Sequence, residues 1–394
     1  MNSIRFGIAG LGNMGGIHAR SLMEGKIPRA TLAAVADPVA DLTPFQGARP
    51  FTSTEAMIAS GEIDALLIAT PHFAHAPLGI AALEQGLHVL IEKPIAVDKA
   101  AAQRLLAAHT NPAQVFAAMF NQRTDPHYTK IRELIQTGEL GEIRRIQWTI
   151  TNWFRTEAYY NSGGWRATWS GEGGGVLLNQ CPHNLDLFQW LFGMPAKVRA
   201  HCQFGRYHAI EVEDDVTAYF EYANGATASF ITSTGEYPGT NRLEIAAERG
   251  RLVVEDGKIH WTRTAVPVSV YSHTAPDRYA GPPTWQIEIP IHGQGAQHNG
   301  VLINFVEAIL DHKPLVAPAQ EGLHSVELAN AMLMSAFFER TIELPLDAEA
   351  YAALLQEKID HSQGDEKLVR IPRSIPATDD CGGSLHVHPS YPSL

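Results

Sequence analysis

The chain has 394 residues, of which 45% are hydrophobic and 18% are charged, and its formal net charge is −12. This length suits two or three domains with sizeable cores, and the acidic balance argues against a surface that binds nucleic acid. No apolar run is long enough to span a bilayer, no signal-peptide pattern is present, and Cys181, Cys202 and Cys381 show no paired spacing. We therefore expect a globular protein of the reducing cytoplasm, with no membrane partner.

The first predicted element is a strand at 4–9, followed directly by the turn Gly10-Leu11-Gly12-Asn13-Met14-Gly15 and by a helical pattern through residue 22. A strand, a G-x-G-x-x-G turn and a helix form the first half of a dinucleotide-binding βαβ unit. Gly10 allows the tight turn, Gly12 lets the backbone approach a pyrophosphate, and Gly15 lets the helix pack closely on the strand. We expect the cofactor phosphates at the helix N-terminus, in contact with Asn13 and Met14.

A second apolar run at 32–36 ends in Asp37. At this place the second strand of a dinucleotide-binding unit presents an acid to the ribose hydroxyls. Asp37 would repel a 2′-phosphate, and it is followed by Pro38 and Val39 with no Arg. The pattern therefore predicts NAD rather than NADP as cofactor; the alternative interpretation is an ordinary surface Asp after a strand.

Alternating elements continue with a strand at 65–70, a helix at 76–84, a strand at 88–91, a helix at 98–109 and a strand at 115–119. This series predicts an α/β fold, a doubly wound parallel sheet of the Rossmann type, over residues 1–124. Ligands bind outside the carboxyl ends of such strands. The cofactor-binding residues expected there are Thr70, Pro71, His75, Glu92, Lys93, Asn121 and Arg123.

The pattern changes after about residue 124. Strands are predicted at 143–150, 216–222, 227–233, 243–247 and 252–255, with Asn224-Gly225 as a two-residue hairpin turn. Helices are predicted at 126–136, 182–191, 301–310 and 323–340. Residues 125–360 are therefore predicted to form an α+β domain with a mostly antiparallel open sheet. We expect this domain to bind substrate and to form the oligomer interface. Residues 361–394 are predicted to be a polar C-terminal tail.

Four motifs stand in order along the chain: the glycine turn, Ala69-Thr70-Pro71 with His75, Glu92-Lys93-Pro94, and Gly173-Gly174-Gly175 followed by His183. With the later Glu321-Gly322 and 326–329, they resemble the Gfo/Idh/MocA family of NAD(P)-dependent oxidoreductases, whose members include sugar and inositol dehydrogenases. The resemblance covers nearly the whole chain except the tail. It implies a carbohydrate or cyclic polyol as substrate and a homodimer or homotetramer built through the second sheet.

Lys93 follows a strand and precedes a proline that fixes its loop. In the resembled family this lysine hydrogen-bonds the reacting hydroxyl and supports proton transfer. A lysine crowded by a positive nicotinamide has a lowered pKa and can act near neutral pH. A surface lysine paired with Glu92 is the alternative interpretation.

His183 lies three residues before Asp186, so both are expected on one face of a helix. We expect His183 to be the main general base, because imidazole titrates nearest to neutral pH. A buried histidine satisfied by Asp186 is the alternative. The resembled family has an Asp four residues before this His, where this chain has Asn179. Asn179 cannot relay a proton, although it can orient His183 or bind a sugar hydroxyl.

Aromatic residues crowd the segment before the glycines, and sugars stack their apolar faces on such rings. We expect the substrate to contact Tyr160, Trp165, Arg155, Arg166, Asn179, His183 and His298. Arg155 and Arg166 have the geometry to bind a hydroxyl cluster, a carboxylate or a sulfonate. Core packing of the rings and solvated arginines are the alternatives. The sequence contains no H-E-x-x-H or paired C-x-x-C pattern, so no metal site is predicted.

The resulting prediction is an NAD-dependent enzyme that oxidises a secondary hydroxyl of a sugar, glycoside or cyclic polyol. His183, assisted by Lys93, removes the hydroxyl proton as a hydride moves to the nicotinamide. The alternative is an NAD-dependent glycoside hydrolase, since the resembled superfamily includes enzymes that oxidise a sugar transiently, eliminate the aglycone, add water and reduce the product. An anionic sugar such as a sulfoquinovoside would then pair with Arg155 or Arg166. A cofactor-binding sensor without chemistry is a third interpretation.

Overall fold

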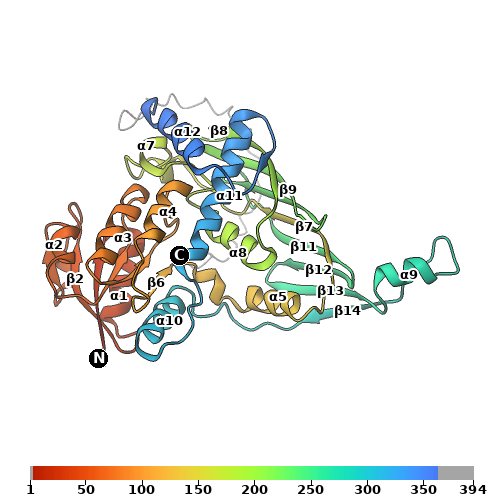
Figure 1. The fold of residues 1–394 in the computed structure, drawn as a ribbon, viewed down its shortest axis with the longest axis horizontal. Helices are drawn as coiled ribbons and strands as arrows, with labels where there is room; N and C mark the ends of the chain where they lie inside the picture. Colours follow the sequence, from red (N-terminus) through yellow and green to blue (C-terminus); the bar gives the residue numbers. More distant parts are fainter. Residues whose placement is uncertain (1–2, 363–394) are drawn as a thin grey trace, which may run out of the picture.

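The computed structural model describes residues 3–362, which form two large sheets with helices packed on them (Figure 1). The first sheet is parallel throughout and has the strand order β3-β2-β1-β4-β5-β6. The order reverses between β1 and β4, which opens a crevice at their carboxyl ends. The predicted doubly wound α/β sheet is confirmed, with strands β1 (Ile4–Ala9), β2 (Ala30–Ala36), β3 (Arg49–Phe51), β4 (Ala65–Ile68), β5 (His88–Ile91) and β6 (Phe116–Ala118).

Helices cover both faces of this sheet, and two of them come from late in the chain. Phe6 of β1 packs on Phe305 of α10 (Gln297–Asp311), and the opposite face packs on the first turns of α11 (Ala319–Phe338). A boundary at residue 124 leaves both helices in the second domain, although they complete the core of the first. The remaining elements here are α1 (Asn13–Met23), α2 (Thr54–Ile58), α3 (His75–Glu84), α4 (Lys99–Ala107), η1 (Thr43–Phe45), η2 (His72–Ala74) and η3 (Asn121–Thr124).

The second sheet has nine strands in the order β14-β13-β12-β11-β7-β10-β9-β8-β15, and β7 and β10 form its parallel pair. The predicted mostly antiparallel sheet is therefore confirmed, including the hairpin turn with Gly225 at φ 87. Its strands are β7 (Ile143–Ile150), β8 (Lys197–Phe204), β9 (Glu213–Glu221), β10 (Thr227–Ser233), β11 (Asn241–Ala247), β12 (Gly250–Glu255), β13 (Lys258–Thr264), β14 (Thr284–Ile289) and β15 (Ile342–Glu343).

Helices cover one face of the second sheet, where Trp148, Phe188 and Phe230 pack in the core. Buried and exposed residues alternate along β9, which leaves the other face open. Figure 1 shows α9 projecting beyond the end of β14. The helices of this half are α5 (Pro126–Gln136), α6 (Glu157–Tyr160), α7 (Trp169–Glu172), α8 (Pro182–Phe192), α9 (Val268–Thr274) and α12 (Ala348–Asp360). The search for a helix long and apolar enough to cross a membrane found none in residues 3–362. The predicted tail lies, apart from residues 361 and 362, outside the described residues.

Candidate active site

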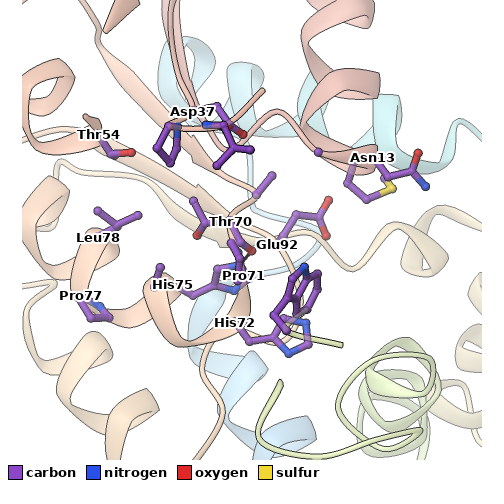
Figure 2. Close-up of a pocket in the computed structure, with 18 of the residues that line it drawn as sticks. Asn13, Asp37, Thr54, Thr70, Pro71, His72, His75, Pro77, Leu78 and Glu92 are labelled. Carbon is purple, nitrogen blue, oxygen red and sulfur yellow. Dashed lines mark hydrogen bonds between the residues drawn. The ribbon is translucent and has the colours of Figure 1, made fainter. Parts of the chain in front are cut away.

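A cavity of about 930 Å3 lies at the carboxyl ends of the first sheet and reaches the second domain. Figure 2 shows Asp37 and Thr54 toward one end and Glu92 and His72 toward the other. Thirteen residues predicted for the site line this cavity: Gly10, Gly12, Asn13, Met14, Asp37, Thr70, Pro71, His75, Glu92, Lys93, Trp165, Arg166 and Asn179. The volume suits a ligand of cofactor size, and the lining joins residues far apart in the sequence.

The glycine turn has the shape that a pyrophosphate requires. Gly10 has φ +84, and a Cβ on Gly15 would lie 1.9 Å from the main-chain oxygen of Gly10. Both positions therefore require glycine for the fold itself. A Cβ on Gly12 would meet no described atom within 4 Å, so this position is open toward the cavity. Helix α1 begins without a side-chain cap, which leaves its first N–H groups for an anion.

Asp37 ties the end of β2 to the glycine turn. Its Oδ2 accepts a hydrogen bond from the Leu11 N–H at 2.6 Å, and its Oδ1 accepts from the N–H groups of Val39 and Ala40 at 2.9 and 2.8 Å. Burial opposes ionisation, but these three hydrogen bonds outweigh it and lower the pKa of Asp37. Asp37 is thus an ionised carboxylate that is fixed at the cavity wall.

His75 and Thr70 shape the middle of the cavity. The His75 ring lies between two main-chain carbonyls, with Nε2 2.8 Å from the Thr70 oxygen and Nδ1 2.7 Å from the Pro94 oxygen. It thereby holds together the loops that follow β4 and β5. The Thr70 hydroxyl is buried and has no hydrogen-bond partner within residues 3–362. A bound ligand would satisfy this hydroxyl, so the residues present fit a dinucleotide.

Glu92 forms a buried pair with a residue that sequence reasoning did not single out. Its Oε1 lies 2.7 Å from Nε2 of His18, and both side chains are almost completely enclosed. Burial opposes the charge on Glu92, but the hydrogen bond and charge of His18 outweigh it and lower the pKa of Glu92 to about 2. The ring of His298 lies 5.6 Å from that of His18 and so belongs to this cluster, outside the cavity lining.

Lys93 is not a surface lysine paired with Glu92. Its Nζ donates a hydrogen bond to the main-chain oxygen of Asn179, 86 positions further along the chain, at 2.8 Å. Burial lowers the pKa of Lys93, the charges of Arg155 and Arg166 lower it further, and Glu92 and Glu172 act in the opposite direction. The lowered pKa agrees with our prediction, and the protein alone is sufficient to cause it.

His183 stands on the first turn of α8, which begins at Pro182. It is 9% exposed, and its Nδ1 is unpaired in the part of the chain that the structure describes. Burial, and after it the charge of Lys93, lowers the pKa of His183 well below its usual value. His183 is therefore neutral at pH 7, and its lowered pKa contradicts the reason for which we expected it to be the general base, namely that it titrates near neutral pH. It does not line the cavity directly, but it lies within the electrostatic reach of Lys93.

Arg123 occupies a different place from the one we expected. Its side chain is fully buried and donates to both carboxyl oxygens of Asp186, at 2.7 and 2.5 Å, and to Glu321. A guanidinium enclosed in this way connects η3 to α8 and does not line the cavity. Because Asp186 binds Arg123, it does not satisfy His183. Asn121 also points elsewhere and donates to Gln297 at 2.8 Å.

The predicted aromatic wall divides into a cavity part and a core part. The Arg166 guanidinium lies 4.7 Å from the ring centroids of both Tyr159 and Trp165, and it donates to the Tyr159 hydroxyl at 2.9 Å. Arg155 lies over Tyr159 at 5.1 Å, beside the cavity lining. Tyr160 instead donates to the Thr234 hydroxyl at 2.9 Å and is buried among core residues, which explains why it contributes nothing to the lining.

Sequence reasoning missed His72, Glu172 and the segment 52–55. His72 lines the cavity, and burial lowers its pKa to about 3. Its position directly after Pro71 was a usable signal, since the residues that follow a parallel strand face the ligand. The segment 52–55 follows the three-residue strand β3, which is too short to produce a hydrophobic pattern.

Comparisons with known proteins agree with this geometry. Sequence models described as "Oxidoreductase family, NAD-binding Rossmann fold" and "GFO/IDH/MocA C-terminal domain" match residues 4–120 and 128–253. Inositol 2-dehydrogenase from Rhizobium meliloti is 25% identical over 349 residues, which is 87% of this chain and 99% of that protein. Inositol 2-dehydrogenase from Corynebacterium glutamicum is 30% identical over 204 residues, 48% of this chain and 55% of that protein.

The crystal structure of the WlbA dehydrogenase from Bordetella pertussis in complex with NADH and UDP-GlcNAcA is similar across both domains. The TM-score is 0.73 at 27% identity, and the similarity covers 88% of this chain and 100% of that one. Fold and site together define an oxidoreductase with an NAD(P)-binding Rossmann domain. The chain belongs to the Gfo/Idh/MocA family of such enzymes.

Proposed function

We propose that this enzyme oxidises a secondary hydroxyl of a sugar, glycoside or cyclic polyol with NAD+ as oxidant. The observation that carries the proposal is that one cavity is lined by the glycine turn, by Asp37 and by Lys93, whose Nζ is held by the main-chain oxygen of Asn179. The similarity to inositol 2-dehydrogenases and to the WlbA dehydrogenase, which was crystallised with UDP-GlcNAcA, supports this substrate class.

Each group near Lys93 has a role in this reaction. NAD+, when bound, supplies the hydride acceptor, with the first turn of α1 and the open Gly12 position toward its phosphates. The Lys93 Nζ donates a hydrogen bond to the reacting hydroxyl, and its charge stabilises the developing alkoxide. The neutral ring of His183 is the proposed acceptor of the hydroxyl proton.

Asp37 supports NAD rather than NADP. Its carboxylate is ionised, fixed by backbone N–H groups and part of the cavity wall. A ribose hydroxyl can donate to it, whereas a 2′-phosphate would meet like charge. The residues after Asp37 in the lining are Pro38 and Val39, which offer no positive charge to such a phosphate.

An NAD-dependent glycoside hydrolase is the second candidate function, and its first chemical step is the same. Arg166 favours it, because this cation lies between two aromatic rings at the substrate end and can hold an anionic sugar such as a sulfoquinovoside. The presence of Asn179 instead of an acid also agrees with a glycoside hydrolase. In that reaction the sugar is reduced again before release, so no net proton has to leave the site with NADH.

One assay separates the two candidates. The enzyme is mixed with NAD+ and with free sugars, cyclic polyols or chromogenic glycosides, including a sulfoquinovoside. NADH absorbance and aglycone release are recorded together. NADH that accumulates with a free sugar or polyol supports the dehydrogenase. Aglycone release that requires NAD+ without NADH accumulation supports the glycosidase. No reaction in either channel, with NADH binding intact, would count against both.

The open face of the second sheet supports a homodimer or homotetramer. Tyr219 of β9 points out of this face and is 45% exposed. A broad face with exposed aromatic side chains is suited to contact with a second copy of the chain. Light scattering that shows a monomer at micromolar concentration would contradict this part of the proposal.

A further inference from the structure

Glu172 is a buried carboxylate directly behind the cavity wall. It ends the short helix α7, just before Gly173, and is 2% exposed. Its Oε2 accepts a hydrogen bond from the Ala167 N–H at 2.7 Å, and its Oε1 accepts from the side-chain amide of Asn179. Nη1 of Arg166 lies 3.8 Å from the same Oε1. The groups that contact the two carboxyl oxygens are thus hydrogen-bond donors and a cation, which favour the ionised form of Glu172 against the effect of burial.

Asn179 connects this carboxyl to the catalytic lysine. Its side chain donates to Glu172, while its main-chain oxygen accepts from the Lys93 Nζ at 2.8 Å. Lys93, Arg166 and Asn179 line the cavity, whereas Glu172 does not. The charge of Glu172 acts on Lys93, and the charge of Lys93 acts on Glu172. Asn179 thus contacts both Lys93, which lines the cavity, and Glu172, which lies in the interior.

We propose that Glu172 is a positioning residue that supplies, from behind Asn179, the carboxylate that this chain lacks at position 179. Its negative charge keeps Lys93 protonated in a site that also contains Arg155 and Arg166, and its hydrogen bond fixes the Asn179 segment from which Lys93 is held. The inference rests on the proposed function for the role of Lys93. The electrostatic link between Glu172 and Lys93 is testable without any substrate.

The protonation of Glu172 changes near neutral pH. Burial outweighs the Ala167 hydrogen bond and the charge of Arg166, and it raises the pKa of Glu172 to about 7. Below that pH the carboxyl is neutral and Lys93 has lost a counter-charge; above it the carboxylate is present. The titratable groups that lie near Glu172 on other elements are Lys93 after β5, His72 of η2, Tyr160 of α6 and Glu213 of β9; the His72 ring lies 3.2 Å from the main-chain oxygen of Glu172. On the side of α12, the contact of α7 is the hydrogen bond between Ser170 and Ser362.

A second buried carboxyl provides a matched control. Burial raises the pKa of Glu213 to about 7 as well. Its oxygens accept from the N–H groups of Gly175 and Leu177, at 2.8 and 3.0 Å, and so fix the glycine segment. Glu213 has the same burial and the same pKa range as Glu172 but bonds to Gly175 and Leu177 rather than to Asn179. It therefore separates a general effect of a buried acid from the specific link to Lys93.

The experiment measures the pKa of Lys93 in the whole protein by competitive acylation with acetic anhydride and peptide mass spectrometry between pH 5 and pH 10. In the unmodified protein, the reactivity of Lys93 should show two inflections, one of them near pH 7 where Glu172 ionises. In Glu172→Gln the lower inflection should disappear and the Lys93 pKa above pH 7 should fall by about one unit, so that acylation at a fixed pH above 7 and below the Lys93 pKa rises about tenfold. Glu213→Gln should keep both inflections, with the lower one moved to a lower pH because the negative charge of Glu213 no longer opposes the ionisation of Glu172.

The double variant Glu172→Gln with Asn179→Asp exchanges the two partners of one hydrogen bond, so that the carboxylate stands at position 179 and the amide at position 172. It should return the Lys93 pKa toward that of the unmodified protein, which a role of Glu172 in packing alone would not achieve. A single inflection in the unmodified protein, or the same Lys93 curve in Glu172→Gln, would overturn the inference. If Glu172→Gln does not fold, the curve of the unmodified protein decides. Absence of turnover on every sugar would contradict the proposed function and leave this measurement valid.

Discussion

The two ends of the cavity are built in different ways. The cofactor end is built from two strand ends: the glycine turn and the start of α1 after β1, and the acid Asp37 after β2, which backbone N–H groups hold in place. The substrate end consists of side chains from separate segments, in which Lys93 reaches Asn179 across 86 positions. The first end depends on local conformation and tolerates distant change. The second holds several buried ionisable groups and depends on the complete fold, and our proposal places the chemistry there.

The test with the largest expected effect replaces the proposed catalytic side chains and leaves the cofactor end of the cavity unchanged. Lys93→Met or His183→Ala should reduce kcat by about 10²–10⁴-fold, because each loses a group that moves or stabilises the hydroxyl proton. NADH affinity should stay within about threefold of the unmodified protein, since the glycine turn and Asp37 do not change. Stopped-flow absorbance gives kcat, and NADH fluorescence gives Kd. Loss of NADH binding in both variants, with folding intact, would contradict the assigned roles.

The buried pair of Arg123 and Asp186 lies outside both ends of the cavity and connects η3 to the helix that carries His183. Arg123→Ala leaves an unpaired buried carboxylate and should lower the free energy of unfolding by about 3–5 kcal/mol. The exposed pair of Arg29 and Asp311 is the matched control, and Arg29→Ala should cost about 0–1 kcal/mol. Denaturant unfolding measures both. An equal decrease in the free energy of unfolding in both variants would show that the buried pair of Arg123 is no more important for stability than an exposed pair.

The cofactor end was predictable because its signals are local. A strand followed by the glycine turn, and the strands that end at Asp37 and Glu92, can be read from short windows of sequence. The strands Ile143–Ile150 and Thr227–Ser233 have the predicted bounds, and α8 ends one residue later than expected, at Phe192, before Gly193. In each case the periodicity and the punctuating residues lie next to each other in the chain.

The substrate end was less predictable because its contacts are long-range. Arg123 follows a strand end, which suggests a cavity residue, yet its side chain binds Asp186, 63 positions away. Glu172 reads as a surface acid beside glycines, and its burial becomes visible only when Lys93 and Asn179 are brought together. The edge strand β14 and the helix α12 were missed because few of their residues are buried, so a periodic pattern is weak.

A smaller change tests whether the cofactor end is a backbone site. A Cβ at Gly12 meets no described atom within 4 Å but would enter the space of a bound pyrophosphate. Gly12→Ala should therefore leave the melting temperature unchanged and raise the NADH Kd about tenfold or more, about 1.4 kcal/mol. Gly16→Ala, in the same helix and outside the cavity lining, is the control and should bind NADH normally. Weaker folding with normal binding in Gly12→Ala would assign the glycine to structure instead.

The smallest expected effect concerns the choice between cofactors. Asp37→Ser removes the ionised carboxylate but keeps an oxygen that can accept from the Leu11 N–H. NAD+ affinity should fall, because a ribose hydroxyl loses its charged acceptor, and NADP+ affinity should rise, because the repulsion of the 2′-phosphate disappears. The ratio of the two affinities should shift about tenfold, and less at high ionic strength. Asp41→Ser, whose carboxylate bonds only locally to Thr43, is the control. An unchanged ratio in Asp37→Ser would mean that shape rather than charge selects the cofactor.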